Sequence, residues 1–221
     1  MQDLKQLEYL ETFITDHRRH RFAEVLKMRT KHFTVATEDV YQLHNTSAVM
    51  RTCDVFGIQE VNIIEEVNSK QIDREIALGA QKWVDLNRYH TTKACIRDLK
   101  EKGYQIVATT PHTEDCELID FDISNKSCFF FGRETEGLSQ HVIDEADSFL
   151  KIPMVGFTES LNISVSAAII LQYVTSKLRA SNIKWQLTEE EVVEKRFDWI
   201  EKTIKNYDAI VARYNNEDKF L

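Results

Sequence analysis

Glycine and proline are scarce in this chain, which has six glycines and two prolines among its 221 residues. It contains no Pro- or Ser-rich linker, no low-complexity segment and no internal repeat. Hydrophobic residues make up 43% of the chain, which is enough for a full core at this length. We therefore expect one domain with helical extensions.

Cysteine and positive charge are also limited. The cysteines at positions 53, 95, 116 and 128 form no C-x-x-C pair and no cluster with histidine, so they predict reduced thiols, a cytoplasmic location and no metal site. The net charge of −8 gives no overall attraction for nucleic acid. The first residues lack a basic region followed by an apolar run, and no apolar stretch approaches the length of a membrane span. We therefore expect no membrane partner.

Several catalytic motifs are absent as well. Without G-x-x-x-x-G-K-[ST] the chain is not a P-loop nucleotidase. Without G-x-G-x-x-G after a strand it has neither a standard dinucleotide site nor the usual glycine loop of Rossmann-type methyltransferases. The G-x-S-x-G nucleophile elbow and the H-E-x-x-H zinc motif are missing too. If the protein is an enzyme, its loops must carry a less common chemistry.

The middle of the chain, from about residue 32 to 181, alternates short β-rich runs with segments of helical spacing. The predicted strands are HFTVAT (32–37), EVNII (60–64), YQIVATT (104–110), SCFFFG (127–132) and SFLKIPM (148–154). Helices are predicted within 47–56 and 91–103, the second ending at Gly103. This order predicts an α/β fold with a parallel sheet covered by helices on both faces. Ligand sites in such folds lie at the carboxyl ends of the strands.

The N-terminal part has helical spacing and concentrated charge. Between His17 and Lys31 there are six basic residues against one acid, a local charge of +5. On its own, such a run is typical of a solvated helix face. The basic residues are Arg18, Arg19, Arg21, Lys27, Arg29 and Lys31.

The C-terminal part is also predicted to be helical. Thr188 and Glu191 form a capping box, and apolar residues then alternate steps of four and three from Val193 to Tyr214, as in a heptad seam. The seam fits packing against the chain's own N-terminal helices as well as packing against a partner. We predict three regions: an N-terminal helical extension (1–32), an α/β domain (33–183) and a C-terminal helix (184–221).

Three polar stretches interrupt the α/β region. In 44–57, Asn45 is expected to cap the helix that it opens, and Arg51 follows two turns later. In 129–139, Gly132 and Gly137 flank a charged turn and would let the backbone approach a ligand closely. In 152–172, polar residues precede a helix so apolar that we expect it to be buried, so these residues need partners. They are Ser160, Asn162 and Ser164.

Together the three stretches read N-x-x-A-x-x-R-T, F-G-x-E-x-x-G-L-S and I-P-M-x-G-x-x-x-S-L-N-I-S-V. In this order and spacing they resemble the SpoU family of RNA ribose 2′-O-methyltransferases, over about residues 20 to 180. Ser166 departs from the pattern, which usually has alanine there. The resemblance implies a parallel α/β sheet whose C-terminal part forms a trefoil knot. It also implies a homodimer paired through the knot region.

The same resemblance implies S-adenosylmethionine as cofactor, bound in a crevice between the knot loops. The cofactor-binding positions implied are Thr109, Gly132, Gly137, Ile152, Met154 and Leu161. The catalytic positions implied are Asn45, Arg51, Glu134, Ser160 and Asn162. Arg51 would take the hydroxyl proton, stabilise the developing alkoxide or clamp an RNA phosphate, and these roles stay open. Glu134 would accept hydrogen bonds from loop amides or from Asn45.

The activity implied is methyl transfer to a ribose 2′-hydroxyl of tRNA, with guanosine 18 in the D-loop as the target. Given such a substrate, the basic run 17–31 is expected to contact phosphates, since backbone neutralisation supplies most non-specific affinity. One alternative is a sister enzyme that modifies another tRNA or rRNA ribose. The other is a non-catalytic RNA-binding relative with the same fold.

Overall fold

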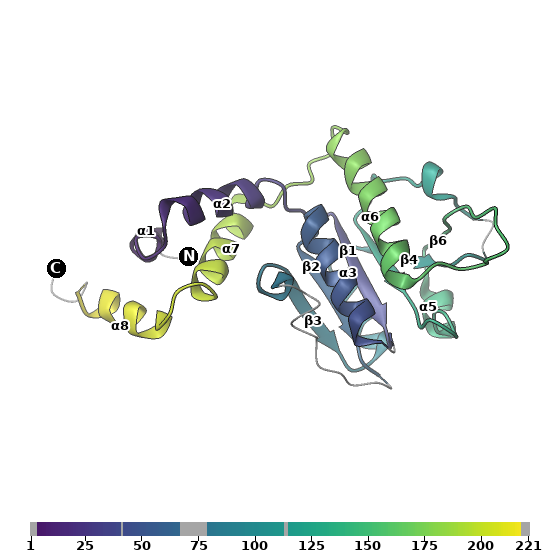
Figure 1. Ribbon diagram of the computed structural model, residues 1–221, viewed down its shortest axis with the longest axis horizontal. Coiled ribbons are helices and arrows are strands. Elements are labelled where there is room, and N and C mark those ends of the chain that lie inside the picture. The colour runs from purple at the N-terminus through teal and green to yellow at the C-terminus, as the bar shows by residue number, and fades with distance from the viewer. Residues whose placement is uncertain (1–3, 41, 67–78, 113–114, 218–221) are drawn as a thin grey trace. The chain divides into compact units, whose positions relative to one another are not determined.

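The computed structural model describes residues 4–40, 42–66, 79–112 and 115–217. The chain divides into two compact units (Figure 1). One unit is Thr30–Trp185, and the other combines Met1–Arg29 with Gln186–Leu221. No helix in these described ranges is long and apolar enough to span a membrane.

The unit Thr30–Trp185 is built on a six-stranded sheet with the order β3-β2-β1-β5-β4-β6, in which every described pair is parallel. The strands are β1 (Phe33–Glu38), β2 (Glu60–Ile64), β3 (Asp85–Tyr89), β4 (Gln105–Thr109), β5 (Ser127–Phe131) and β6 (Ser148–Leu150). The predicted α/β class with a parallel sheet is confirmed. Because all strands are parallel, their carboxyl ends lie at one edge.

Helices cover both faces of this sheet. Side chains alternate along the central strands, so Phe129 and Phe131 of β5 pack on one face while Cys128 and Phe130 pack on the other. The first face is covered by α3 (Leu43–Phe56) and α6 (Ile163–Arg179), which lie side by side (Figure 1). The second is covered by α4 (Thr92–Glu101) and α5 (Gln140–Glu145). Two short 3-10 helices, η1 (Ala80–Lys82) and η2 (Leu118–Asp120), complete the unit. Both faces are therefore buried.

Some elements differ from the sequence prediction. Strand β3 was not predicted, because its sequence DLNRY is polar and lies at the partly exposed edge of the sheet. Its Asn87 donates a hydrogen bond to Asn62 of β2 at 3.1 Å, so a polar ladder replaces the usual apolar alternation. Strand β6 ends at Leu150, before the KIPM that was included in the prediction.

Helix α6 is buried along only one side, although its apolar sequence predicted full burial. Ile170, Leu171 and Val174 are at most 1% exposed, whereas Val165 is 45% and Ile169 is 38% exposed. The two exposed residues are four apart and therefore lie on one face of the helix. The apolar residues of α6 therefore form one face that is buried within this unit and a second face that is exposed.

The second unit contains α1 (Leu4–Glu11), α2 (Asp16–Leu26), α7 (Glu189–Glu201) and α8 (Tyr207–Glu217). The sequence prediction left open whether the C-terminal part packs against the N-terminal helices, and in the structure the two parts do pack together. Phe22 of α2 meets Trp199 of α7 edge to face at 5.3 Å. Arg196 of α7 donates two hydrogen bonds to Glu11 of α1, at 2.9 and 2.5 Å. The two ends of the chain therefore share one small core.

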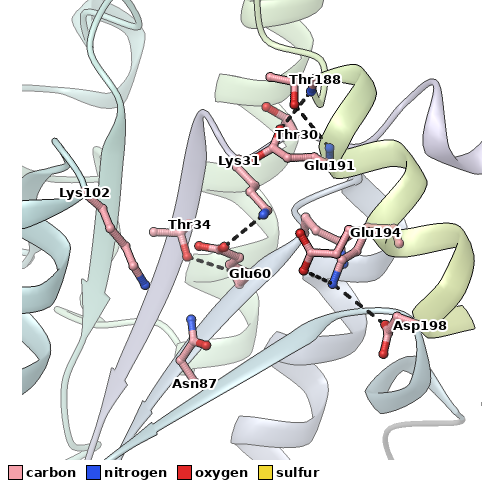
Figure 2. A network of polar contacts seen from close by, with 12 residues as sticks. Thr30, Lys31, Thr34, Glu60, Asn87, Lys102, Thr188, Glu191, Glu194 and Asp198 are labelled. Carbon is pink, nitrogen blue, oxygen red and sulfur yellow. Dashed lines mark hydrogen bonds and ion pairs between the residues drawn. The ribbon is translucent and has the colours of Figure 1, made fainter. Parts of the chain in front are cut away.

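The C-terminal part is not the single helix that was predicted. It breaks between α7 and α8, where Asn206 adopts a left-handed backbone with φ of 59°. The capping box at the start of α7 is confirmed: the Thr188 amide donates to the Glu191 side chain at 2.8 Å, and the Glu191 amide donates to Thr188 Oγ1 at 3.2 Å (Figure 2). Both helices contact α1, and the ring of Tyr214 in α8 lies 5.2 Å from that of Tyr9 in α1, so part of the apolar seam packs within the chain.

Candidate functional site

A pocket of about 600 Å³ lies at the carboxyl ends of β4, β5 and β6. Its walls come from the segments that follow these strands, together with the first turns of α3 and α6. Ten of the residues predicted from sequence line it: Asn45, Thr109, Gly132, Glu134, Gly137, Ile152, Met154, Ser160, Leu161 and Asn162. The structure thus brings the three polar stretches of the sequence to one cavity.

Hydrogen bonds join these three stretches to one another. Asn45 Nδ2 donates to Glu134 Oε1 at 2.7 Å, and Asn162 Nδ2 donates to Asn45 Oδ1 at 3.1 Å. A carboxylate can only accept, so the amide group of Asn45 must face Glu134 and its oxygen must face Asn162. Asn45 is 1% exposed, which makes an unpaired amide there costly. The chain Asn162–Asn45–Glu134 therefore fixes the relative positions of α6, α3 and the loop after β5.

Asn45 does not cap α3 as the sequence suggested. The helix begins at Leu43, and Gln42 is the N-cap residue, with no side-chain capping bond. Asn45 lies inside the first turn, which aims its side chain across the pocket. Asn162 is the residue that caps a helix: its Oδ1 accepts from the amide and hydroxyl of Ser164, at 2.8 and 2.6 Å, at the start of α6.

The loop after β5 closes as a tight turn. The Arg133 amide donates to the Gly137 carbonyl at 2.9 Å, and the Gly137 amide donates to the Arg133 carbonyl at 3.0 Å. A Cβ on Gly132 would lie 2.3 Å from the carbonyl carbon of Gly137 and 2.4 Å from the amide nitrogen of Leu138. Gly137 has φ of 72° and open space around a built Cβ. Close approach to a ligand was the expected reason for both glycines, but the loop's own backbone already requires them.

Charged side chains surround this turn. Arg133 is hydrogen-bonded to Glu136 within the loop and to Asp39 at 3.3 Å. The bond to Glu136, followed by the bond to Asp39, raises the pKa of the Arg133 guanidinium above its ordinary value. Arg133 therefore stays a cation, and its charge is engaged by carboxylates at the rim of the pocket.

Arg51 does not join the residues that line the pocket. It lies six residues beyond Asn45 on α3, which on an α-helix is about 9 Å along the axis and about 240° around it. Its side chain is exposed, on the outer stripe of α3 that also carries the 67% exposed Val55. A group in solution can reach Arg51 without entering the pocket.

The predicted RNA-contacting set divides into accessible and inaccessible residues. Arg29 is 1% exposed, with its guanidinium 5.5 Å from the Trp199 ring centre, so burial removes it from the set. Lys31 is partly buried and pairs with Glu60 at 3.5 Å (Figure 2). The remaining residues are exposed on or next to α2: Arg18, Arg19, Arg21 and Lys27.

Sequence reasoning missed Glu38 and Asp39, the two acids at the end of β1. They are 2% and 3% exposed, and both bind residues of the loop after β5. The signal was available, because two acids directly follow a buried strand at the edge where parallel sheets bind ligands. Thr110 and His112, which line the pocket beyond β4, were also missed.

Comparison with known proteins agrees with the motifs. The SpoU rRNA Methylase family matches residues 32–172. The tRNA (guanosine(18)-2′-O)-methyltransferase of Borreliella burgdorferi is 40% identical over 213 residues, covering 96% of this chain and 98% of the relative. The A. aeolicus TrmH/SpoU tRNA modifying enzyme superposes with a TM-score of 0.76 and 31% identity, over 86% of this chain and 98% of that one.

A more distant neighbour shares the fold. The SpoU methyltransferase AviRb from Streptomyces viridochromogenes, solved in complex with AdoMet, superposes with a TM-score of 0.64 at 20% identity, over 72% of this chain and 65% of that one. The family match covers more than half of the chain, and the Borreliella relative aligns along nearly its whole length. This chain therefore belongs to the SpoU rRNA methylase family.

Proposed function

We propose that the protein transfers a methyl group from S-adenosylmethionine to the ribose 2′-hydroxyl of guanosine 18 in tRNA. The observation that carries the proposal is the hydrogen-bonded chain Asn162–Asn45–Glu134, which assembles the three family motifs at one pocket. The substrate follows from the Borreliella relative, whose name states this activity and whose alignment covers 96% of the chain.

The pocket fits an adenosine-bearing cofactor in size and chemistry. Its volume of about 600 Å³ lies within the roughly 300–1,000 Å³ of small-molecule sites. Leu138, Leu150 and Ile152 line it, next to Gly132 and Gly137 of the turn after β5. S-adenosylmethionine supplies an electrophilic methyl group on a sulfonium. The residues that would hold it are the loop after β5 together with Thr109, Ile152, Met154 and Leu161.

This chain's own residues then position the hydroxyl and manage its charge. Asn45 and Asn162 hold the motif loops in register, and Ser160 lies at the pocket rim. Positioning alone can supply up to roughly 7–11 kcal/mol of barrier reduction in ideal geometry. We infer that the Arg51 guanidinium donates hydrogen bonds to the ribose oxygen or to its phosphate as the alkoxide develops.

Transfer of labelled methyl groups tests the proposal directly. With methyl-labelled S-adenosylmethionine, we expect label in full-length tRNA transcripts and none in rRNA fragments. The labelled product should resist alkaline cleavage at one position, because a methylated 2′-oxygen cannot attack the adjacent phosphodiester. Label in rRNA alone would identify a sister enzyme. RNA binding without any transfer would identify a non-catalytic relative.

We propose that the exposed basic side chains of α2 contact tRNA phosphates. Arg18, Arg19 and Arg21 project from a short helix, and Arg21 is 67% exposed. Replacing all three with alanine should weaken tRNA binding and lower the slope of log affinity against log salt by about one for each lost phosphate contact. Replacing buried Arg29 is the contrasting variant, since it should lower stability instead. An unchanged salt slope in the triple variant would show that these three arginines form a solvated helix face and do not contact phosphates.

We also propose a homodimer whose interface covers the outward apolar surface. Val155 and Phe157 are fully exposed in the loop after β6, and Val55, Val165 and Ile169 are exposed on α3 and α6. Val165 and Ile169 lie on one face of α6, and grouped exposed apolar side chains are typical of protein–protein interaction sites. Light scattering should give twice the chain mass of 25.9 kDa at micromolar concentration, and a 25.9 kDa species would contradict the dimer.

The trefoil knot remains a proposal drawn from the family resemblance. The segments it would involve, 132–138 and 152–162, both line the pocket. An experimental trace of the backbone through these two segments tests it, and an unthreaded path would rule it out.

A further inference from the structure

Two adjacent acids, Glu38 and Asp39, lie at the carboxyl end of β1, next to β5 in the sheet. They are 2% and 3% exposed, although acidic residues are rarely buried this completely. Neither lines the pocket. Their contacts therefore need an explanation other than direct binding of a ligand.

Glu38 holds the far end of the loop after β5. Its Oε2 accepts from the Ser139 amide at 2.8 Å, and its Oε1 accepts from the Ser139 hydroxyl at 2.6 Å. Ser139 is the N-cap residue of α5, where its hydroxyl also accepts from the Val142 amide at 3.4 Å. The Thr92 hydroxyl, from α4, donates to Glu38 Oε1 at 2.6 Å. Glu38 thus ties the last residue of the loop to β1 and α4.

Asp39 holds the near end of the same loop. Its Oδ2 accepts from the Arg133 guanidinium at 3.3 Å, and its Oδ1 accepts from the Glu66 amide at 2.9 Å. Asp39 has φ of 45°, a left-handed backbone that few residues other than Gly, Asn and Asp adopt. A constrained backbone at a ligand-binding edge points to a functional requirement.

Between these two anchors the loop is held by the Asn45–Glu134 hydrogen bond and by the paired backbone hydrogen bonds of Arg133 and Gly137. Glu134, Thr135, Glu136 and Gly137 are exposed, so apolar burial does not hold the turn. Hydrogen bonds to charged acceptors are about twice as strong as neutral ones, and burial strengthens them further. The conformation of the loop therefore depends on its polar anchors.

We propose that Glu38 and Asp39 are positioning residues that clamp the two ends of the loop 133–139, and that they set cofactor affinity without touching the cofactor. The inference rests on the proposed function only in taking S-adenosylmethionine as the ligand of this pocket. Holding the loop in its bound shape beforehand removes an ordering cost from binding, which is how pre-organisation raises affinity.

Isosteric variants test the clamp, with cofactor titrated by calorimetry into the full-length protein. Glu38→Gln and Asp39→Asn each keep the side-chain shape but replace a charged acceptor, and each should raise the Kd for S-adenosylmethionine by about tenfold. Ser139→Ala should do the same, and Ser139→Thr, which keeps the hydroxyl, should restore affinity. Thr92→Val is the matched control. It removes a donor to the same Glu38 oxygen from outside the loop, so the Kd should stay within about twofold.

Hydrogen exchange without cofactor gives a second readout. In Glu38→Gln, Asp39→Asn and Ser139→Ala, the paired amides of Arg133 and Gly137 should exchange faster than in the wild type, and in Thr92→Val they should not. Equal effects of Thr92→Val and Ser139→Ala on both readouts would show that Glu38 only stabilises the fold, which overturns the proposal. A wild type that binds no S-adenosylmethionine while its loop amides follow the expected pattern would contradict the proposed function and leave the clamp standing.

Discussion

Replacing Gly132 with alanine is expected to weaken S-adenosylmethionine binding by up to about a hundredfold, because overpacking of this kind typically costs about 1–3 kcal/mol. The added Cβ would lie 2.3–2.4 Å from backbone atoms of Gly137 and Leu138, which cannot move aside as a side chain could. The turn between Arg133 and Gly137 must open, and the pocket wall moves with it. Calorimetric titration of the cofactor measures the loss.

Variants of two other glycines distinguish a steric clash with the backbone from the strain of a left-handed backbone. Gly137 has open space around a Cβ but φ of 72°, so Gly137→Ala should cost only the strain of a left-handed residue, about 1–2 kcal/mol of stability. Gly156 has its nearest Cβ neighbour at 3.9 Å and no left-handed backbone, so Gly156→Ala should bind like the wild type. Near-normal affinity in Gly132→Ala would show that the turn does not shape the pocket.

Replacing Arg51 with alanine is expected to lower the rate of methyl transfer by about 10²–10³-fold, the usual cost of removing a donor that stabilises transition-state charge. Cofactor affinity should remain normal, since Arg51 is exposed on α3 away from the pocket-lining residues. Single-turnover rates at saturating tRNA and cofactor separate chemistry from binding.

Arg51→Lys distinguishes geometry from charge. Lysine keeps the positive charge but loses the planar fork of donors. If Arg51 only neutralises a phosphate, lysine should recover a substantial part of the rate. If it binds ribose and phosphate through two donors, lysine should stay nearly inactive. Wild-type single-turnover rates in Arg51→Ala would place the catalytic residue elsewhere.

The sequence predicted the fold class because strong signals agreed. Buried strands such as SCFFF are short apolar runs, and the capping residues Thr91 and Thr188 and the stop at Gly103 lie where helices begin and end. Strand β3 escaped prediction because edge strands carry polar residues, and the sheet, not the local sequence, stabilises it. The break between α7 and α8 at Asn206 was not predicted, because the apolar periodicity of the sequence continues across it.

The residues of the site could be predicted from the sequence, but their hydrogen-bond partners could not. Motif order placed Asn45, Glu134 and Asn162 in one pocket, yet only the folded chain shows that they bond to one another. The sequence marked Glu38 as an acid after a buried strand, but not its partner Ser139, which lies 101 positions away in the chain. It also marked Gly132 and Gly137 as flanking a turn, but not that a Cβ on Gly132 would meet the backbone of Gly137. Burial of Arg29 was likewise invisible in a run of basic residues.

Nucleoside mapping of a single tRNA tests the central claim most directly. The purified protein is incubated with S-adenosylmethionine and one of two otherwise identical tRNAs, which carry either guanosine or 2′-deoxyguanosine at position 18. Mass spectrometry of the digested product should find one 2′-O-methylguanosine, at position 18 of the first tRNA, and no methylation of the second. Equal methylation of both tRNAs, or a methyl group on a base, would contradict the account.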